Sequence, residues 1–104
     1  CHSVDPNLSG RAYRFDRLTL HRARAEDVAI KARQAVVVAV HSHASFEAAI
    51  GCVREAERIA YVAIPCCYAT TLAPWAPDEA YEDKGILSPD RRVLVWHDVA
   101  GRTA

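Results

Sequence analysis

Two short motifs hold most of the side chains in this sequence that could do chemistry. HSH at residues 41–43 follows the apolar run 35–40, and PCCY at residues 65–68 follows the apolar run 59–64. Imidazole and thiol groups serve as general bases, nucleophiles and zinc ligands. Which of these roles is open to them depends on whether the fold brings the two motifs together.

The strands and the helix expected around the motifs indicate that the fold brings the two motifs together. The run 35–40 is continuous and rich in valine, which favours a central parallel strand covered on both faces. Ser45 suits a helix N-cap, and apolar residues at helical spacing then predict an amphipathic helix of about three to four turns, up to Arg54 and Arg58. A second strand over 59–64 completes a strand–helix–strand unit with parallel strands, so both motifs would leave at the same carboxyl edge.

Shorter elements are expected on both sides of this unit. A strand at the start ends in a turn at Asp5, residues 17–21 alternate as a second strand, and residues 24–33 suit a short helix or turn. Residues 72–85 are expected to form a loop, followed by a hairpin of 85–87 and 91–99 around the turn at 88–91. We therefore predict one α/β domain over 1–104, with a Rossmann-like, doubly wound, mostly parallel sheet that ends in an antiparallel hairpin.

Composition limits the classes of function. The 104 residues carry equal numbers of acidic and basic side chains, so no overall field attracts nucleic acid or membrane. The longest apolar run is far too short to cross a bilayer. Four cysteines are too few for a secreted disulfide framework, which predicts a reducing, cytoplasmic location. The absence of methionine and the start at Cys1 lead us to expect the C-terminal portion of a longer protein, without its first strand.

The segment VVVAVHSHASFEAAI, followed by AIPCCY, resembles a known family. It is similar to the methyltransferase-like domain of glutathione S-transferase C-terminal domain-containing proteins, a group of Rossmann-like class I methyltransferases. The resemblance covers about residues 36–71 well and the flanks loosely. It implies methyl transfer from S-adenosylmethionine to an acceptor, by proximity and alignment rather than through a covalent intermediate. The acceptor is open: RNA is suggested by related families and by an arginine-rich stretch over residues 11–24, while protein and small molecules are not excluded.

The same resemblance implies roles for individual residues. Asp5 would accept hydrogen bonds from the cofactor's ribose hydroxyls, and Glu26 or Asp27 would accept one from the adenine amino group. His41 would lie beside the transferred methyl group, as a cofactor-binding and catalytic residue. The family's glycine-rich turn is not found in this sequence, so we expect the chain alone to bind the cofactor weakly or not at all, and we assign catalysis to its parent protein.

The remaining motif residues would contact the substrate. They are His43, Pro65, Cys66, Cys67 and Tyr68. Tyr68 would also be catalytic, because its ring and hydroxyl can stack on or hydrogen-bond a flat acceptor.

Three other interpretations stay open. The first is a degenerate methyltransferase-like interaction module without catalysis. The second is a zinc-binding or cysteine-dependent site formed by His41, His43, Cys66 and Cys67, although this spacing is not that of a zinc finger and our favoured site contains no metal. The third is compatible with methyl transfer and is the role that we favour for at least one of the two adjacent cysteines: packing at the end of the strand.

Overall fold

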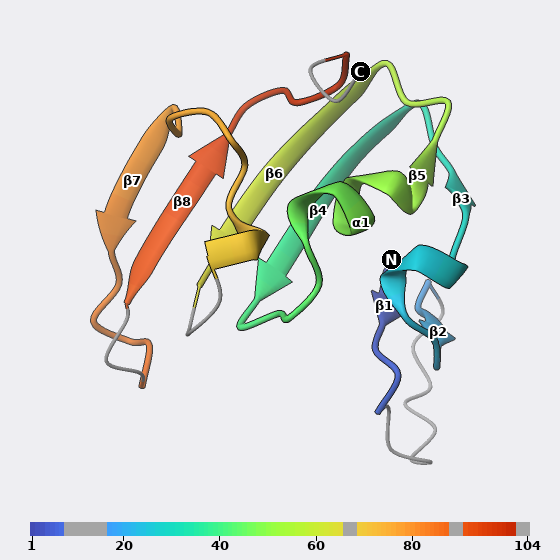
Figure 1. Cartoon of the computed structure of the whole chain (residues 1–104), viewed down its shortest axis with the longest axis horizontal. Coiled ribbons are helices and arrows are strands. Elements are labelled where there is room, and N and C mark those ends of the chain that lie inside the picture. Colours follow the sequence, from blue (N-terminus) through green and yellow to red (C-terminus); the bar gives the residue numbers. More distant parts are fainter. Residues whose placement is uncertain (8–16, 66–68, 88–90, 102–104) are drawn as a thin grey trace.

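The computed structural model describes residues 1–7, 17–65, 69–87 and 91–101. Its largest element is a four-stranded sheet in the order β4 (Gln34–Val40), β6 (Arg58–Ile64), β8 (Arg92–Trp96) and β7 (Glu79–Glu82). Strands β4 and β6 are parallel, and β8 runs antiparallel to both β6 and β7 (Figure 1). The parallel pair and the final antiparallel strand confirm that part of the prediction.

Two further parallel pairs stand outside this sheet. Strand β1 (His2–Val4) pairs with β2 (Thr19–His21), and β3 (Ile30–Lys31) pairs with β5 (Val53–Arg54). A 3₁₀ turn, η1 (Ala25–Asp27), connects β2 to β3. The strands expected near the start of the chain therefore exist, but they do not join the main sheet.

The helix α1 (Phe46–Gly51) begins where the sequence predicts and ends earlier. The Ser45 hydroxyl accepts a hydrogen bond from the backbone N–H of Ala48, at 3.1 Å, which is an N-cap. Instead of continuing toward Arg58, the chain pairs β5 with β3, and the Ile30 N–H donates to the Cys52 carbonyl at 2.6 Å. The predicted length of three to four turns is wrong because strand pairing takes the residues that the helical spacing had assigned to the helix.

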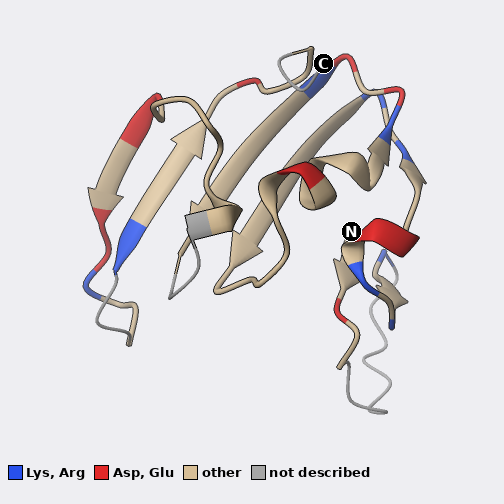
Figure 2. Ribbon diagram, viewed as in Figure 1, with Lys and Arg blue, Asp and Glu red and all other residues tan. Residues whose placement is uncertain are grey.

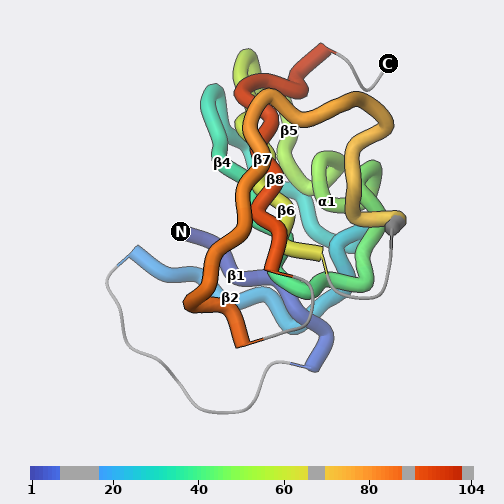
Figure 3. Tube along the Cα trace, turned by 90° about the vertical axis from the view of Figure 1, so that its left-hand side faces the viewer, coloured from blue at the N-terminus to red at the C-terminus, as the bar shows by residue number. Residues whose placement is uncertain are grey.

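The core lies on one face of the main sheet, beneath α1 and the segment that follows the 3₁₀ turn η2 (Ala69–Thr71). Figure 3 shows both of them on the same side of the strands. Phe46 meets Tyr61 edge to face, with ring centroids 5.0 Å apart. The Tyr61 hydroxyl donates to the Thr71 carbonyl at 2.6 Å, and the Trp96 indole N–H donates to the Trp75 carbonyl at 3.0 Å. Each buried aromatic polar group thus has a partner, which removes the cost of burying it.

The opposite face of the sheet is not covered in the same way, and this overturns the predicted fold class. The structure is built of small sheets with short helices, and a Rossmann-like doubly wound fold is not seen. Strand β4 was expected to be central and covered on both faces, but it lies at the edge of its sheet. Its residues Val36, Val38 and Val40 are 68%, 56% and 57% exposed. A continuous apolar run does not reveal how many faces its neighbours cover, and that is why the prediction failed.

The final hairpin also differs from the prediction. Its second strand, β8, is confirmed, whereas the first is β7 within the expected loop and not residues 85–87. Residues around Gly85 form a turn instead, in which the Asp83 carboxylate accepts the Gly85 N–H at 2.9 Å. Every residue of β7 is exposed, so no buried row of side chains marks this edge strand in the sequence.

Candidate functional site

The ends of β4 and β6 bring the two motifs of interest to one edge of the sheet. Val40 is the register partner of Ile64, and the backbone N–H of His41 donates to the Ile64 carbonyl at 2.8 Å. HSH and the start of PCCY therefore leave side by side, as the sequence predicts. Cys66, Cys67 and Tyr68, predicted to contact substrate, lie outside the described residues.

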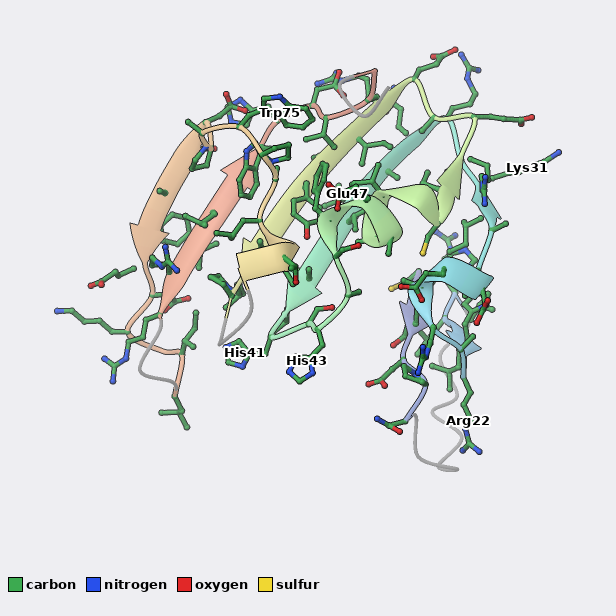
Figure 4. All side chains as sticks on the ribbon, viewed as in Figure 1. Arg22, Lys31, His41, His43, Glu47 and Trp75 are labelled. Carbon is green, nitrogen blue, oxygen red and sulfur yellow. The ribbon has the colours of Figure 1, made fainter. Side chains whose placement is uncertain are left out.

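His41 leaves the strand in an unusual backbone conformation. Its φ angle is +46°, in the left-handed region that residues other than glycine seldom adopt, although histidine is among the more frequent exceptions. Such a conformation costs roughly 1 kcal/mol or more and is often found at functional sites. The side chain is exposed at the tip of β4, where Figure 4 shows His41 and His43 projecting from the same edge.

The segment after His41 is held by local hydrogen bonds. The Ser42 hydroxyl accepts the backbone N–H of Ala44 at 3.1 Å, immediately before the Ser45 cap of α1. His43 is exposed between these two contacts. Consequently the turn that carries both imidazoles is anchored at β4 on one side and at α1 on the other.

Pro65 is buried, unlike the two histidines. A proline has no N–H to donate, so it suits the point at which β6 ends. It follows Ile64 directly, so this buried residue lies at the end of β6.

Asp5, predicted to hold the ribose, takes part in a turn after β1. Its carboxylate oxygen Oδ1 accepts the backbone N–H of Asn7 at 2.8 Å, and its own N–H donates to the His21 carbonyl at 3.1 Å. This is an Asx turn, in which a side chain replaces a backbone acceptor. The side chain is exposed, but one of its oxygens already has a structural role.

Glu26 and Asp27, predicted to contact adenine, are exposed on η1. The turn is fixed to α1 through Cys52, whose thiol donates to the Ala25 carbonyl at 3.0 Å and to the Ala48 carbonyl at 3.5 Å. Burial raises the pKa of the Cys52 thiol, and the charge of Glu26 adds to that shift, so the thiol stays protonated and keeps its donor. Sequence reasoning does not predict this anchor, because an isolated cysteine has no pattern around it.

A pair of histidines in the small β1–β2 sheet was also not anticipated. The rings of His2 and His21 stack with centroids 5.2 Å apart, and His2 Nδ1 lies 3.0 Å from His21 Nε2. The two residues are separated by 19 positions and meet only because β1 and β2 pair in parallel. This pairing could not be inferred from either residue alone.

His97 lies at the end of the sheet opposite the HSH motif. It follows β8, which runs antiparallel to β6, so it leaves at the edge opposite His41. Its ring Nε2 lies 2.9 Å from the Glu79 carboxylate, and its backbone N–H donates to Asp78 at 2.8 Å. The hydrogen bond to Glu79, aided by the charge of Asp78, raises the pKa of His97.

Neither a metal-binding cluster of described residues nor a pocket near α1 contributes to this edge. Among the residues that the structure describes, no three His, Cys, Asp or Glu side chains are grouped to hold a metal ion. The zinc interpretation depends on Cys66 and Cys67 and thus falls outside those residues. The pocket lies by the start of β6, away from His41; its lining includes Glu47, Ile50, Arg54, Ile59 and Ala100.

The arginine-rich stretch is only partly described. Arg17, Arg22 and Arg24 are exposed, whereas Arg11 and Arg14 lie outside the described residues. Figure 2 shows the basic residues around β2 next to the acidic turn η1. The charge there is mixed and does not form a purely basic surface. No helix within the described ranges has the length and apolar character needed to span a membrane.

No family model matches the chain, and neither a curated protein nor a solved structure matches it.

Proposed function

We propose that this chain takes part in S-adenosylmethionine-dependent methyl transfer, with the edge formed by the ends of β4 and β6 as the place where the acceptor meets the methyl group. The observation that carries the proposal is the position of His41. It stands at the end of one parallel strand, in a left-handed backbone conformation, and is hydrogen-bonded to the end of the next strand. The motif residues that resemble the methyltransferase family leave from these same two ends.

Some described residues carry hydrogen-bond acceptors that match the hydrogen-bond donors of the cofactor. Its ribose hydroxyls and adenine amino group are hydrogen-bond donors, and the exposed carboxylates of Glu26 and Asp27 are acceptors. Asp5 is a weaker candidate, since Oδ1 already accepts the Asn7 N–H. When bound, S-adenosylmethionine supplies an electrophilic methyl group on a positively charged sulfur.

The chain's own contribution is positioning and proton transfer. An acceptor that loses a proton on methylation needs a nearby base, and the exposed imidazole of His41 can serve as that base. The anchored turn between β4 and α1 limits where that imidazole stands. Alignment of the two reactants then accounts for most of the rate acceleration. RNA is the acceptor that we propose to test first, and the cytoplasmic location remains a prediction.

A second candidate is the interaction module without catalysis. It is favoured by the exposure of Val36, Val38 and Val40, which form an apolar row on the uncovered face of β4. Exposed apolar patches of this kind frequently mark protein contacts. This module would keep the sheet while binding no cofactor.

Transfer of a labelled methyl group from S-adenosylmethionine separates the two candidates. The parent protein that contains this chain is incubated with total RNA, or with a protein extract, and incorporation is compared among the wild type, His41→Ala and His97→Ala. We expect incorporation that falls at least tenfold in His41→Ala and is unchanged in His97→Ala, the matched histidine at the far end of the sheet. The result against methyl transfer is no incorporation into either acceptor pool, together with no calorimetric binding of S-adenosylmethionine.

A further inference from the structure

The outer edge of strand β4 has no partner strand within the described part of the chain. Strand β6 pairs with β4 along all seven of its residues, from Gln34 to Val40, on the inner side. The N–H and C=O groups that point the other way must bond to water or to another strand. Natural sheets seldom leave such an edge unprotected, because it is a template for pairing with another chain.

Hydrogen bonds at both ends of β4 show which residues face that outer edge. The Arg33 carbonyl accepts from the N–H groups of Glu57 and Arg58, and the His41 N–H donates to Ile64. Odd-numbered residues therefore point their backbone groups toward β6. Since the direction alternates along a strand, the N–H and C=O groups of Val36, Val38 and Val40 point outward.

The same three residues also expose their side chains on the uncovered face. Between residues 35 and 40 there is no proline, no lysine and no other charged side chain of the kind that blocks edge pairing. An outward row of backbone donors and acceptors thus coincides with a row of exposed β-branched side chains. Both features favour an added strand.

We propose that this edge pairs with β4 of a second copy of the chain, antiparallel and about a two-fold axis at Val38. In this register Val38 lies opposite Val38 of the second copy, and Val36 lies opposite Val40 of the second copy. Strand β4 ends at Val40 and His41 turns out of the strand, so the paired stretch is limited to residues 36–40 of each copy. The two sheets become one continuous sheet through backbone hydrogen bonds at the three valine pairs.

Two features favour a second copy over an unrelated extended segment. The row is self-complementary, as a two-fold interface requires, and it brings β-branched side chains into cross-strand pairs. The chain also has a formal net charge of zero, so two copies do not repel one another at long range.

The expected dimer is weak. Pairing at a strand edge covers less than the roughly 800 Å² per partner that a stable interface buries. We therefore expect the dimer to form at high micromolar protein and to dissociate on dilution. The inference does not depend on methyl transfer, because it uses residues of β4 and none of the groups assigned to chemistry.

Sedimentation equilibrium over a hundredfold concentration range tests the proposal. Wild type is compared with Val38→Lys and with Leu87→Lys, a matched control at a leucine that is 98% exposed outside β4. We expect dimer at the highest concentrations for wild type and the control, and a dissociation constant at least tenfold larger for Val38→Lys. Circular dichroism confirms that both variants are folded. A wild type that stays monomeric at millimolar concentration overturns the proposal.

Amide hydrogen exchange tests the register independently of any substitution. At low concentration we expect slow exchange at Val37 and Ala39, which face β6, and fast exchange at Val36, Val38 and Val40. Raising the concentration should slow exchange at these three valines alone. A dimer in which their exchange stays fast must use another surface, and that result also contradicts the proposal.

Discussion

The two faces of the main sheet both carry apolar residues, but they lie in different surroundings. On one face Tyr61 and Trp96 are 0% and 1% exposed, beneath α1 and the segment after η2. On the other, Val36, Val38 and Val40 are more than half exposed. Adjacent valines of β4 point to opposite faces, so the difference does not come from the strand's own residues. It comes from the elements that pack against one face.

The covered face differs in a second way, because polar groups of its aromatic residues are anchored. The Tyr61 hydroxyl and the Trp96 indole each donate to a carbonyl of the segment between β6 and β7. These bonds fix the segment's position over the sheet while the rings supply the buried area. Coverage of a sheet face in this protein therefore depends on a few aromatic residues that pack and hydrogen-bond at the same time.

Removing the largest of these residues should have the largest effect. Trp96→Ala leaves a cavity beside Tyr61 and removes the donor to the Trp75 carbonyl, which should lower the free energy of unfolding by about 3–5 kcal/mol. Urea unfolding followed by circular dichroism measures the change. A loss below about 1 kcal/mol would mean that the covered face is not the core.

The Tyr61 hydroxyl provides a pH-dependent test of the same face. Burial raises the pKa of Tyr61 from 10.0 to about 12, with a smaller contribution from the charge of Glu47. The neutral form is thus favoured in the folded state, and its contribution is fully present below pH 10 and is lost as the pH rises toward 12. The difference between these two pKa values corresponds to roughly 2–3 kcal/mol of folding stability.

Tyr61→Phe should remove that pH dependence. It should also lower stability at pH 7 by roughly 1–2 kcal/mol, because the buried Thr71 carbonyl loses its donor. Urea unfolding of both proteins between pH 8 and 11.5 gives the comparison. Parallel pH profiles for the two proteins would show that the hydroxyl is not buried.

Neighbouring valines of β4 give the most direct comparison between the faces. Val37 packs against the core, while Val38 points to the uncovered face. A hydroxyl introduced by Val37→Thr should cost about 1–2 kcal/mol, whereas Val38→Thr should stay within about 0.5 kcal/mol. Both are measured by urea unfolding at a low protein concentration, at which β4 edges do not associate. Equal losses would mean that both faces are covered.

The smallest effect is expected at His97, which is exposed and outside both faces. Its pKa is raised by the hydrogen bond to Glu79, so the charged form is favoured and the small stabilisation is lost as the pH rises through that pKa. Glu79→Gln should lower the pKa of His97 in an NMR titration, with little change in the urea midpoint at pH 7. An unchanged pKa would rule out the contact with Glu79.

Part of this structure could be predicted from the sequence, namely the elements with strong local signals. The β-branched run of β4, the Ser45 cap and the proline that ends β6 identify a parallel unit with two motifs at one edge. Alternation likewise identifies β8. Each of these signals depends on residues close together in the chain.

The remaining features depend on contacts between distant residues. The length of α1 was mispredicted because β5 pairs with β3, more than 20 residues earlier, and β7 was missed because none of its side chains is buried. The prediction of a Rossmann-like sheet was wrong for the same reason, because it required β1 and β2 to join the sheet that contains β4. In the site, neither the left-handed conformation of His41 nor the anchor at Cys52 has a sequence signature.

The central claim is that the edge at the ends of β4 and β6 receives S-adenosylmethionine and its acceptor. Backbone amide NMR during a titration with S-adenosylmethionine to millimolar concentration tests it most directly, because weak binding still shifts resonances at the contact. The account predicts shifts confined to residues 41–44 and to η1 at Glu26 and Asp27. Shifts only around Ile59 and Ala100 at the far end of β6, or no shifts at that concentration in the parent protein, would contradict it.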